Sequence, residues 1–307
     1  MLQIFCLGLV GFVLVRRKVF SKEGLTGLTN LLIEVLLPSL MFWQIVTKFN
    51  FGIYSNWWLF PLASLIITIF GLAMGYVFSA SSKDKILRKE FVSLIAFQNS
   101  GYLPLTLLGW IVPKEQVSTA LIYLFLFLMG FNLVIWSWGV YFLSSHKSRY
   151  FSFPSLFSPP VIATLLGLIC VALKINSIIP EFVLSPLNML GQCSFPLAII
   201  VVGASLADLY VNKPVNIALI GKLVLAKLII LPLCGLALVS YVRLPYLIGL
   251  LFVLELAVPS ATSLAVIVRK YTKEESIISQ GVFVTHIASI VTLPLVLSLF
   301  NWIVLQR

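Results

Sequence analysis

Two short stretches of similar character decide the fold: Asn99-Ser100-Gly101-Tyr102-Leu103-Pro104 and Glu255-Leu256-Ala257-Val258-Pro259-Ser260. Both lie deep inside apolar segments, at matching places in the two halves of the chain. Proline inside a helix removes a hydrogen bond and clashes with the preceding turn, and a bilayer core offers no water to replace that bond. Such a break is tolerated only where protein or a wet cavity covers it, and a matched pair of breaks indicates the binding site of a transporter.

The composition around these breaks is typical of a polytopic membrane protein. Of the 307 residues, 60% are hydrophobic and 10% are charged, whereas soluble domains carry about 25% charged residues. The net charge of +11 does not indicate nucleic-acid binding, because the basic residues lie in short loops with no basic domain or arm. Cysteine and histidine spacings typical of a metal site are absent from the sequence, so no metal cofactor is expected.

The apolar runs predict ten transmembrane helices. The first is predicted as a short span and not as a cleavable signal peptide, because it lacks a basic leading region and a small-residue cleavage site. In the third, Gly71 and Gly75 predict close packing against another helix. The segments are Leu2–Val15, Leu25–Val46, Trp57–Ser79, Phe91–Trp110, Val117–Leu143, Pro159–Leu173, Phe182–Leu209, Val215–Tyr241, Pro245–Val268 and Ile277–Leu305.

Five helices in each half make an odd number, so two copies of a five-helix unit would insert with opposite orientation. The prolines support such a repeat: Pro38 and Pro196 fall in the second helix of their halves, and Pro104 and Pro259 fall in the fourth. We therefore predict an all-α membrane protein built from two inverted repeats. The repeats would span residues 1–150 and 151–307, with broken helices four and nine.

Basic residues predict the orientation, because cytoplasmic loops are enriched in lysine and arginine. Fourteen basic residues follow the odd-numbered helices and five lie on the other side, which places both termini outside the cytoplasm of a multi-pass cell-membrane protein. The fourteen are Arg16, Arg17, Lys18, Lys22, Lys83, Lys85, Arg88, Lys89, Lys147, Arg149, Lys213, Arg269, Lys270 and Lys273; the five are Lys48, Lys114, Lys174, Arg243 and Arg307.

The residues at the two breaks suit an anionic substrate. A broken helix exposes N–H groups at the start of one half-helix, and such ends bind anions. If the two broken helices cross, two such ends meet near the bilayer midplane. The alternative is that the polar side chains there only satisfy freed backbone groups. The predicted substrate contacts at the breaks are Gln98, Asn99, Ser100, Gly101, Pro104, Pro259 and Ser260.

Glu255 is the strongest single candidate for a functional residue, because a carboxylate inside an apolar helix is energetically costly and by default functional. It could coordinate a cation, with Asn99 and Thr262, or it could carry a proton. The alternative is that Glu255 is the buried partner of Lys222 or Lys227. Lys227 lies deep enough to attract an anion instead.

Two polar residues precede the prolines of the second and seventh helices. Glu34 precedes Pro38 by one turn, and Gln192 precedes Pro196. Glu34, Pro38 and Gln192 are predicted to face the same substrate cavity. His286 in the last helix is predicted to be a packed, hydrogen-bonded histidine.

Several motifs resemble the auxin efflux carrier family, including its bacterial members described as malate or malonate permeases. The likeness covers nearly the whole chain. The matching stretches are Arg16-Arg17-Lys18, Leu36–Phe42, Asn99–Leu105, Pro196–Ala207, Pro259–Tyr271 and Thr292–Leu295. This resemblance implies crossed fourth and ninth helices, elevator-like movement against a scaffold of the first, second, sixth and seventh helices, and organic-anion substrates. The scaffold helices could also join two copies as a homodimer.

The leading hypothesis is a secondary transporter for a small organic anion in a lipid bilayer, with no cofactor and with possible sodium or proton coupling. The alternative is a sodium-coupled symporter of the bile acid type, whose fold is similar and whose ninth-helix glutamate falls at Glu255, although Pro259 departs from that pattern. An enzyme is not expected, because no nucleophile–base pair is recognisable. Nothing marks the selectivity filter of a channel.

Overall fold

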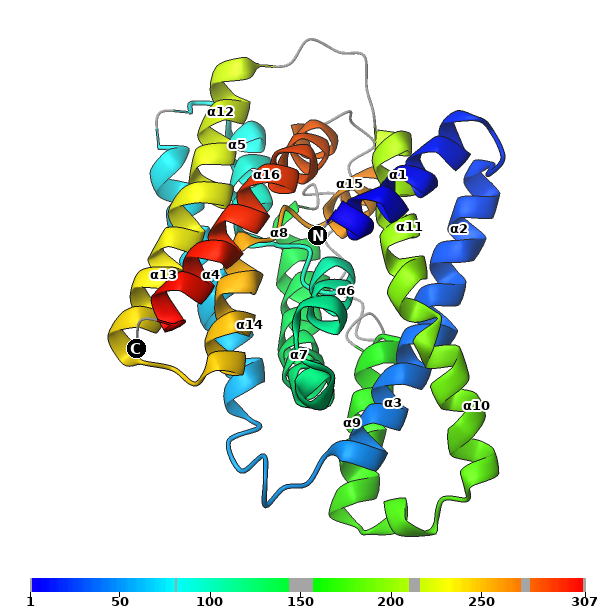
Figure 1. The fold of residues 1–307 in the computed structure, drawn as a ribbon. Helices are drawn as coiled ribbons and strands as arrows, with labels where there is room; N and C mark the ends of the chain where they lie inside the picture. The colour runs from blue at the N-terminus through cyan, green and yellow to red at the C-terminus, as the bar shows by residue number, and fades with distance from the viewer. Residues whose placement is uncertain (1, 81, 144–156, 210–215, 272–276, 306–307) are drawn as a thin grey trace. The chain divides into compact units, whose positions relative to one another are not determined.

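The computed structural model describes residues 2–80, 82–143, 157–209, 216–271 and 277–305. Over these ranges the chain is helical and contains no strand, so the all-α prediction is confirmed (Figure 1). Some basic residues used for the orientation lie outside the described ranges, namely Lys147, Arg149, Lys213, Lys273 and Arg307.

Six helical stretches within the described residues are long and apolar enough to cross a membrane. Three of them contain a five-residue π-turn, which inserts one wide turn into an α-helix. The six stretches are Lys22–Lys48 (α2 Lys22–Leu31, η1 Leu32–Leu36, α3 Leu37–Lys48), Leu59–Phe78 (α4), Lys114–Leu143 (α7 Lys114–Val134, η2 Ile135–Gly139, α8 Val140–Leu143), Glu181–Leu209 (α10 Glu181–Gln192, α11 Ser194–Leu209), Ile217–Val242 (α12 Ile217–Leu225, η5 Ala226–Ile230, α13 Leu231–Val242) and Ile277–Val304 of α16 (Ile277–Leu305).

The remaining helices are shorter. They are α1 (Leu2–Arg16), α5 (Lys85–Ala96), α6 (Tyr102–Ile111), α9 (Pro159–Ala172), the 3₁₀ helix η4 (Ile175–Ile178), α14 (Tyr246–Ala257) and α15 (Ser263–Tyr271). The predicted fourth and ninth spans are each two helices with a non-helical link, as the prolines indicated. The helices occupy the ten predicted apolar stretches, while ten spans in two inverted repeats stay a prediction.

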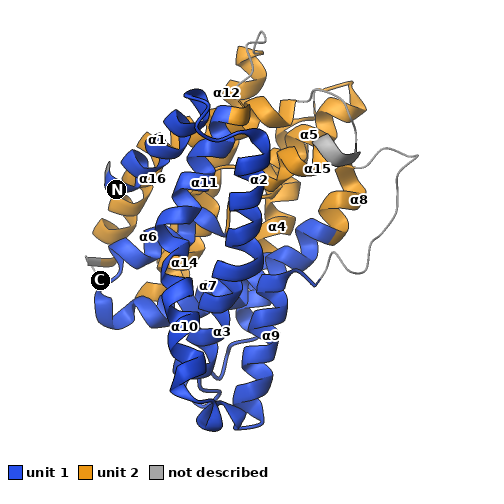
Figure 2. Ribbon diagram, turned by 90° about the vertical axis from the view of Figure 1, so that its right-hand side faces the viewer, with its two compact units in different colours: residues 1–64, 101–136, 152–207 blue, residues 65–100, 137–151, 208–307 orange. Residues whose placement is uncertain are grey.

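The chain folds into two compact units, and each draws on both halves of the sequence (Figure 2). Unit 1 comprises residues 1–64, 101–136 and 152–207. Unit 2 comprises residues 65–100, 137–151 and 208–307. The first helix interruption therefore straddles a boundary between units after Ser100, whereas the second lies wholly in unit 2.

Unit 1 is held together by helices that approach through glycine. The α3 helix packs against α9 and α10. A Cβ on Gly191 of α10 would lie 2.8 Å from the Leu40 Cα in α3. A Cβ on Gly203 of α11 would collide with the Gly8 carbonyl of α1. Small residues let helix backbones approach this closely, which is the main source of packing energy between helices in a membrane.

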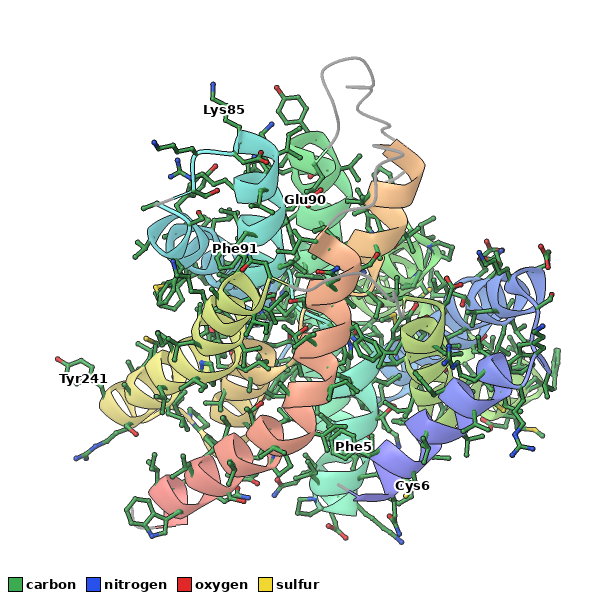
Figure 3. All side chains as sticks on the ribbon, turned by 90° about the horizontal axis from the view of Figure 1, so that it is seen from above. Phe5, Cys6, Lys85, Glu90, Phe91 and Tyr241 are labelled. Carbon is green, nitrogen blue, oxygen red and sulfur yellow. The ribbon has the colours of Figure 1, made fainter. Side chains whose placement is uncertain are left out.

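Unit 2 places α14 and α16 against α13, and α16 also contacts α5 and α12. The Glu90 carboxylate of α5 accepts a hydrogen bond at 3.2 Å from the N–H of Ile277, the first residue of α16. Figure 3 labels the Glu90 side chain. This contact satisfies one of the N–H groups left free at the start of a helix. The start of α16 is therefore tied to α5, the helix that ends at the first interruption.

The predicted close packing at Gly71 and Gly75 is confirmed within unit 2. A Cβ on Gly71 would lie 2.7 Å from the Ala96 Cα, and one on Gly75 would lie 2.8 Å from the Val92 Cα. Both neighbours are backbone atoms of α5, which cannot move aside as a side chain can. These glycines therefore fix the position of α5 close to its C-terminal end.

We expect Gly71→Ala to lower the thermal stability of the purified protein, because the added methyl group meets backbone. Overpacking costs about 1–3 kcal/mol, which outweighs the gain of about 1 kcal/mol from replacing glycine by alanine in a helix. The matched control is Gly221→Ala in α12, where a Cβ meets nothing within 4 Å. The control should be at least as stable as wild type in a detergent melting assay, and equal melting of the two variants would contradict the prediction.

Candidate functional site

The two helix interruptions have different local causes. At the first, Phe97 leaves the helical conformation (φ −102°, ψ 112°) and α6 begins at Tyr102, so Pro104 lies in the first turn of a new helix. Proline is tolerated there because the first N–H groups of a helix have no intrahelical partner. At the second, Val258 is extended (φ −70°, ψ 151°) and Pro259 lies in the link. Proline disfavours the helical conformation in the residue before it, which explains why α14 ends at Ala257.

Main-chain hydrogen bonds join the two interruptions inside unit 2. Gln98 and Ser260 form an antiparallel bridge. The Asn99 N–H donates to the Pro259 carbonyl at 2.8 Å, and the Ala261 N–H donates to the Phe97 carbonyl at 2.9 Å. Each unwound segment thus satisfies backbone groups of the other, where lipid could satisfy none.

Side chains from the second interruption and from η5 satisfy the carbonyls at the end of α5. The Ser260 hydroxyl donates to the Leu94 carbonyl at 2.6 Å, and the Lys227 ammonium of η5 donates to the Ile95 carbonyl at 3.0 Å. The Ser260 N–H donates in turn to the Thr285 hydroxyl of α16 at 3.3 Å. Ser260, predicted as a substrate contact, therefore uses its hydroxyl proton to hold the fold, and its role in binding stays a prediction.

Asn99 forms a buried pair with His286 of α16. The Asn99 Nδ2 lies 3.1 Å from the His286 Nε2, and the His286 Nδ1 lies 2.8 Å from the Val282 carbonyl. A carbonyl only accepts, so the His286 Nδ1 carries the proton and the neutral Nε2 accepts from Asn99. The prediction of a packed, hydrogen-bonded histidine is confirmed. Its contact with Asn99 was not predicted.

A second set of polar atoms at the interruptions forms no hydrogen bond of good geometry within the described residues. These atoms are both carboxylate oxygens of Glu255, the amide oxygen and nitrogen of Gln98, and the hydroxyl of Ser100. Gln98, Ser100 and Lys227 lie close enough to Glu255 to interact with its carboxylate. We call these four residues the polar cluster. Buried polar groups are nearly always paired, so unpaired ones within a cluster indicate a place for a ligand.

Of the two candidate partners of Glu255, the structure favours Lys227 over Lys222. Lys227 is 1% exposed and interacts electrostatically with Glu255. Lys222 is exposed and five residues away on α12. The π-turn η5 interrupts the regular helix between the two lysines and carries Lys227.

The remaining predicted site residues lie elsewhere. Glu34 is exposed in η1, and Pro38 lies in the first turn of α3. Gln192 ends α10 and donates to the Asn188 side chain at 3.1 Å. These three belong to unit 1, where η1 and α3 both contact α10, and Gly101 and Pro104 also belong to unit 1. Thr262 is partly buried in unit 2, just before α15.

The sequence profile of a family described as membrane transport protein matches residues 1–154 and 149–297. The chain belongs to this family. It is the auxin efflux carrier family that the motifs indicated. Membership of this family indicates a function in transport across a membrane.

Two archaeal members align with almost the full length of the chain. An uncharacterized transporter of Methanothermobacter thermautotrophicus is 27% identical over 301 residues, covering 96% of this chain and 95% of its own. An uncharacterized transporter of Methanocaldococcus jannaschii is 24% identical over 314 residues, covering 99% of this chain and 98% of its own. The similarity therefore extends through both interruptions and all described helices.

We expect Ser260→Ala to destabilise the protein, because it leaves the Leu94 carbonyl buried without its donor. Such an unsatisfied group costs about 1–3 kcal/mol. The matched control is Ser263→Ala, a partly buried serine at the start of α15. The melting temperature in detergent should fall for Ser260→Ala by several degrees more than for Ser263→Ala. A Ser260→Ala protein as stable as wild type would show that the hydroxyl has no structural role.

Proposed function

We propose that the chain is a secondary active transporter for a small organic anion. The substrate would be a carboxylate such as malate, malonate or an auxin-like acid, moved by elevator-type alternating access. Family membership supports transport. The choice of an anion rests on the chemistry of the interrupted helices, because the N-terminal end of a helix carries a partial positive charge and free N–H groups.

The proposal includes an arrangement in the membrane. Ten helices would form two inverted five-helix repeats with crossed broken helices, and both termini would lie outside the cytoplasm. The helices occupy the ten predicted apolar stretches, which supports the count. The scaffold helices could pair two copies. In such folds the substrate binds where discontinuous helices meet near the bilayer midplane.

One observation carries the proposal: the two interruptions are hydrogen-bonded to each other, through Asn99 and Pro259 and through Phe97 and Ala261. A proline that only kinks a helix does not require a second broken helix, about 160 residues away in sequence, to pair with it. Breaking two helices inside a membrane is energetically unfavourable, even when the two interruptions complete each other's hydrogen bonds. In transporters, paired interruptions of this kind form the binding site.

The proposed substrate contacts are of two kinds. The proposed main-chain donor in unit 2 is the N–H of Ser263 at the start of α15, because the N–H groups of Leu264 and Ala265 already donate to the Ala261 and Thr262 carbonyls. The side-chain donors would be Gln98 and Ser100, which interact with Glu255 but form no hydrogen bond of good geometry. Asn99 holds this segment through His286 and presents its amide oxygen as an acceptor.

A sodium-coupled symporter of the bile acid type is the alternative to this proposal, and it would require a free coupling ion at the Glu255 carboxylate. Oxygen atoms are the ligands that hard cations prefer. Asn99 and Thr262 are the other proposed contacts for a coupling ion. A proton is the alternative coupling ion at the same carboxylate.

We expect purified protein in liposomes to take up radiolabelled malate, malonate or indole acetate faster than empty vesicles. Asn99→Ala removes the bond to His286 and should lower the initial rate at least about tenfold, the effect of about 1.4 kcal/mol. The matched control is Asn56→Ala, an exposed amide between α3 and α4, which should transport as wild type does. Correctly inserted protein with no flux above empty vesicles for the whole panel would reject the proposed function.

A further inference from the structure

Lys227 lies at a depth where a lysine side chain cannot reach water at either end of its helix. The run Ile217–Val242 is a candidate membrane span of 26 residues. Lys227 is ten residues from its start and fifteen from its end, which at 1.5 Å per residue is roughly 15 and 22 Å. Its side chain is 1% exposed. Lysines near the ends of a span extend to the interface, whereas an ammonium at this depth needs partners inside the protein.

The first partner is the end of α5. The Lys227 ammonium donates to the Ile95 carbonyl at 3.0 Å, one residue before α5 ends at Ala96. The last carbonyls of a helix lack intrahelical partners and carry a partial negative charge. Where a membrane helix is broken, such carbonyls are the groups that coordinate a cation. The ammonium therefore occupies a position whose chemistry suits a positive charge.

The second partner is Glu255, which is 0% exposed. Neither of its carboxylate oxygens forms a hydrogen bond of good geometry, although the side chains of Gln98 and Ser100 lie beside this carboxylate and interact with it. A carboxylate, a main-chain carbonyl, an amide oxygen and a hydroxyl are the oxygen donors of a site for a hard cation. The polar cluster thus has the ligands of a cation site and already contains one positive charge.

The charges of Lys227 and Glu255 cancel, which bears on what the cluster can bind. A free cation added to the cluster would meet the ammonium and be repelled. If the ammonium were removed, Glu255 would remain as a buried charge without compensation, which is strongly unfavourable. The cluster would then favour any small cation that could enter.

We propose that the Lys227 ammonium is the built-in cation of the polar cluster and takes the place of a free coupling cation. The native protein then binds no sodium at Glu255. A variant without the ammonium acquires a site for a monovalent cation, such as sodium or methylammonium, formed by the Glu255 carboxylate and the Ile95 carbonyl. The transport consequence, sodium-independent flux, rests on the proposed function, whereas the binding consequence does not.

The test compares melting temperatures of purified protein in sodium chloride and in choline chloride at equal ionic strength. Wild type should melt at the same temperature in both salts. Lys227→Ala should melt lower than wild type in choline and rise by roughly 5 °C as sodium saturates the site, since a ligand that binds only the folded state raises its stability. Methylammonium should substitute for sodium. The matched control, Lys222→Ala, removes an exposed lysine from the same helix and should respond as wild type does.

The double variant Lys227→Met with Glu255→Gln removes both charges and should fold with no response to either cation. If Lys227→Ala cannot be purified, recovery of the double variant supports the pairing of the two charges, and loss of both contradicts it. A saturable rise of the wild-type melting temperature in sodium, or a folded Lys227→Ala that ignores both cations, would overturn the proposal. Absence of flux in liposomes would reject the transport proposal alone and leave these binding results standing.

Discussion

The structure depends on the requirement that an unwound backbone inside a membrane find its hydrogen-bond partners in protein. The C-terminal carbonyls of α5 show how this is met: Leu94 accepts from the Ser260 hydroxyl, Ile95 from the Lys227 ammonium and Phe97 from the Ala261 N–H. The partners come from two segments, Lys227 and Ser260-Ala261, that are far from α5 in sequence. An unsatisfied group costs several kcal/mol in lipid, so these segments must stay together for α5 to end where it does.

Much of the fold could be predicted because membrane helices have strong signals. The apolar runs predicted the helical stretches. Pro104 and Pro259 predicted both interruptions, since proline acts on its own local backbone. Gly71 and Gly75 predicted a close helix contact, since two glycines four residues apart lie on one face of a helix and let another backbone approach. Family membership followed from motif order along the whole chain and is confirmed.

The contacts within the site were harder to predict, because they depend on which helices meet. The pairing of Asn99 with His286 joins residues 187 positions apart, and its sole local signal was a polar pair, Thr285-His286, in an apolar run. The π-turn η5, which carries Lys227, contains no proline or glycine itself, and Pro232 two residues after it does not reveal which turn is widened. Whether Glu255 pairs with Lys222 or Lys227 could not be decided from sequence, since both lie on one helix and only burial separates them.

The distribution of partners within unit 2 limits how an anion could be held. The Ser260 hydroxyl and one Asn99 amide proton are used internally, and the charge of Lys227 is balanced by Glu255. No net side-chain charge is then left in the polar cluster to attract a carboxylate. Within unit 2, the remaining donors that could face an anion are then the main chain where α15 begins and the neutral side chains of Gln98 and Ser100. Such groups bind an anion without a buried lysine or arginine that would hold it too tightly to release, which suits a site that must open to both sides of a membrane.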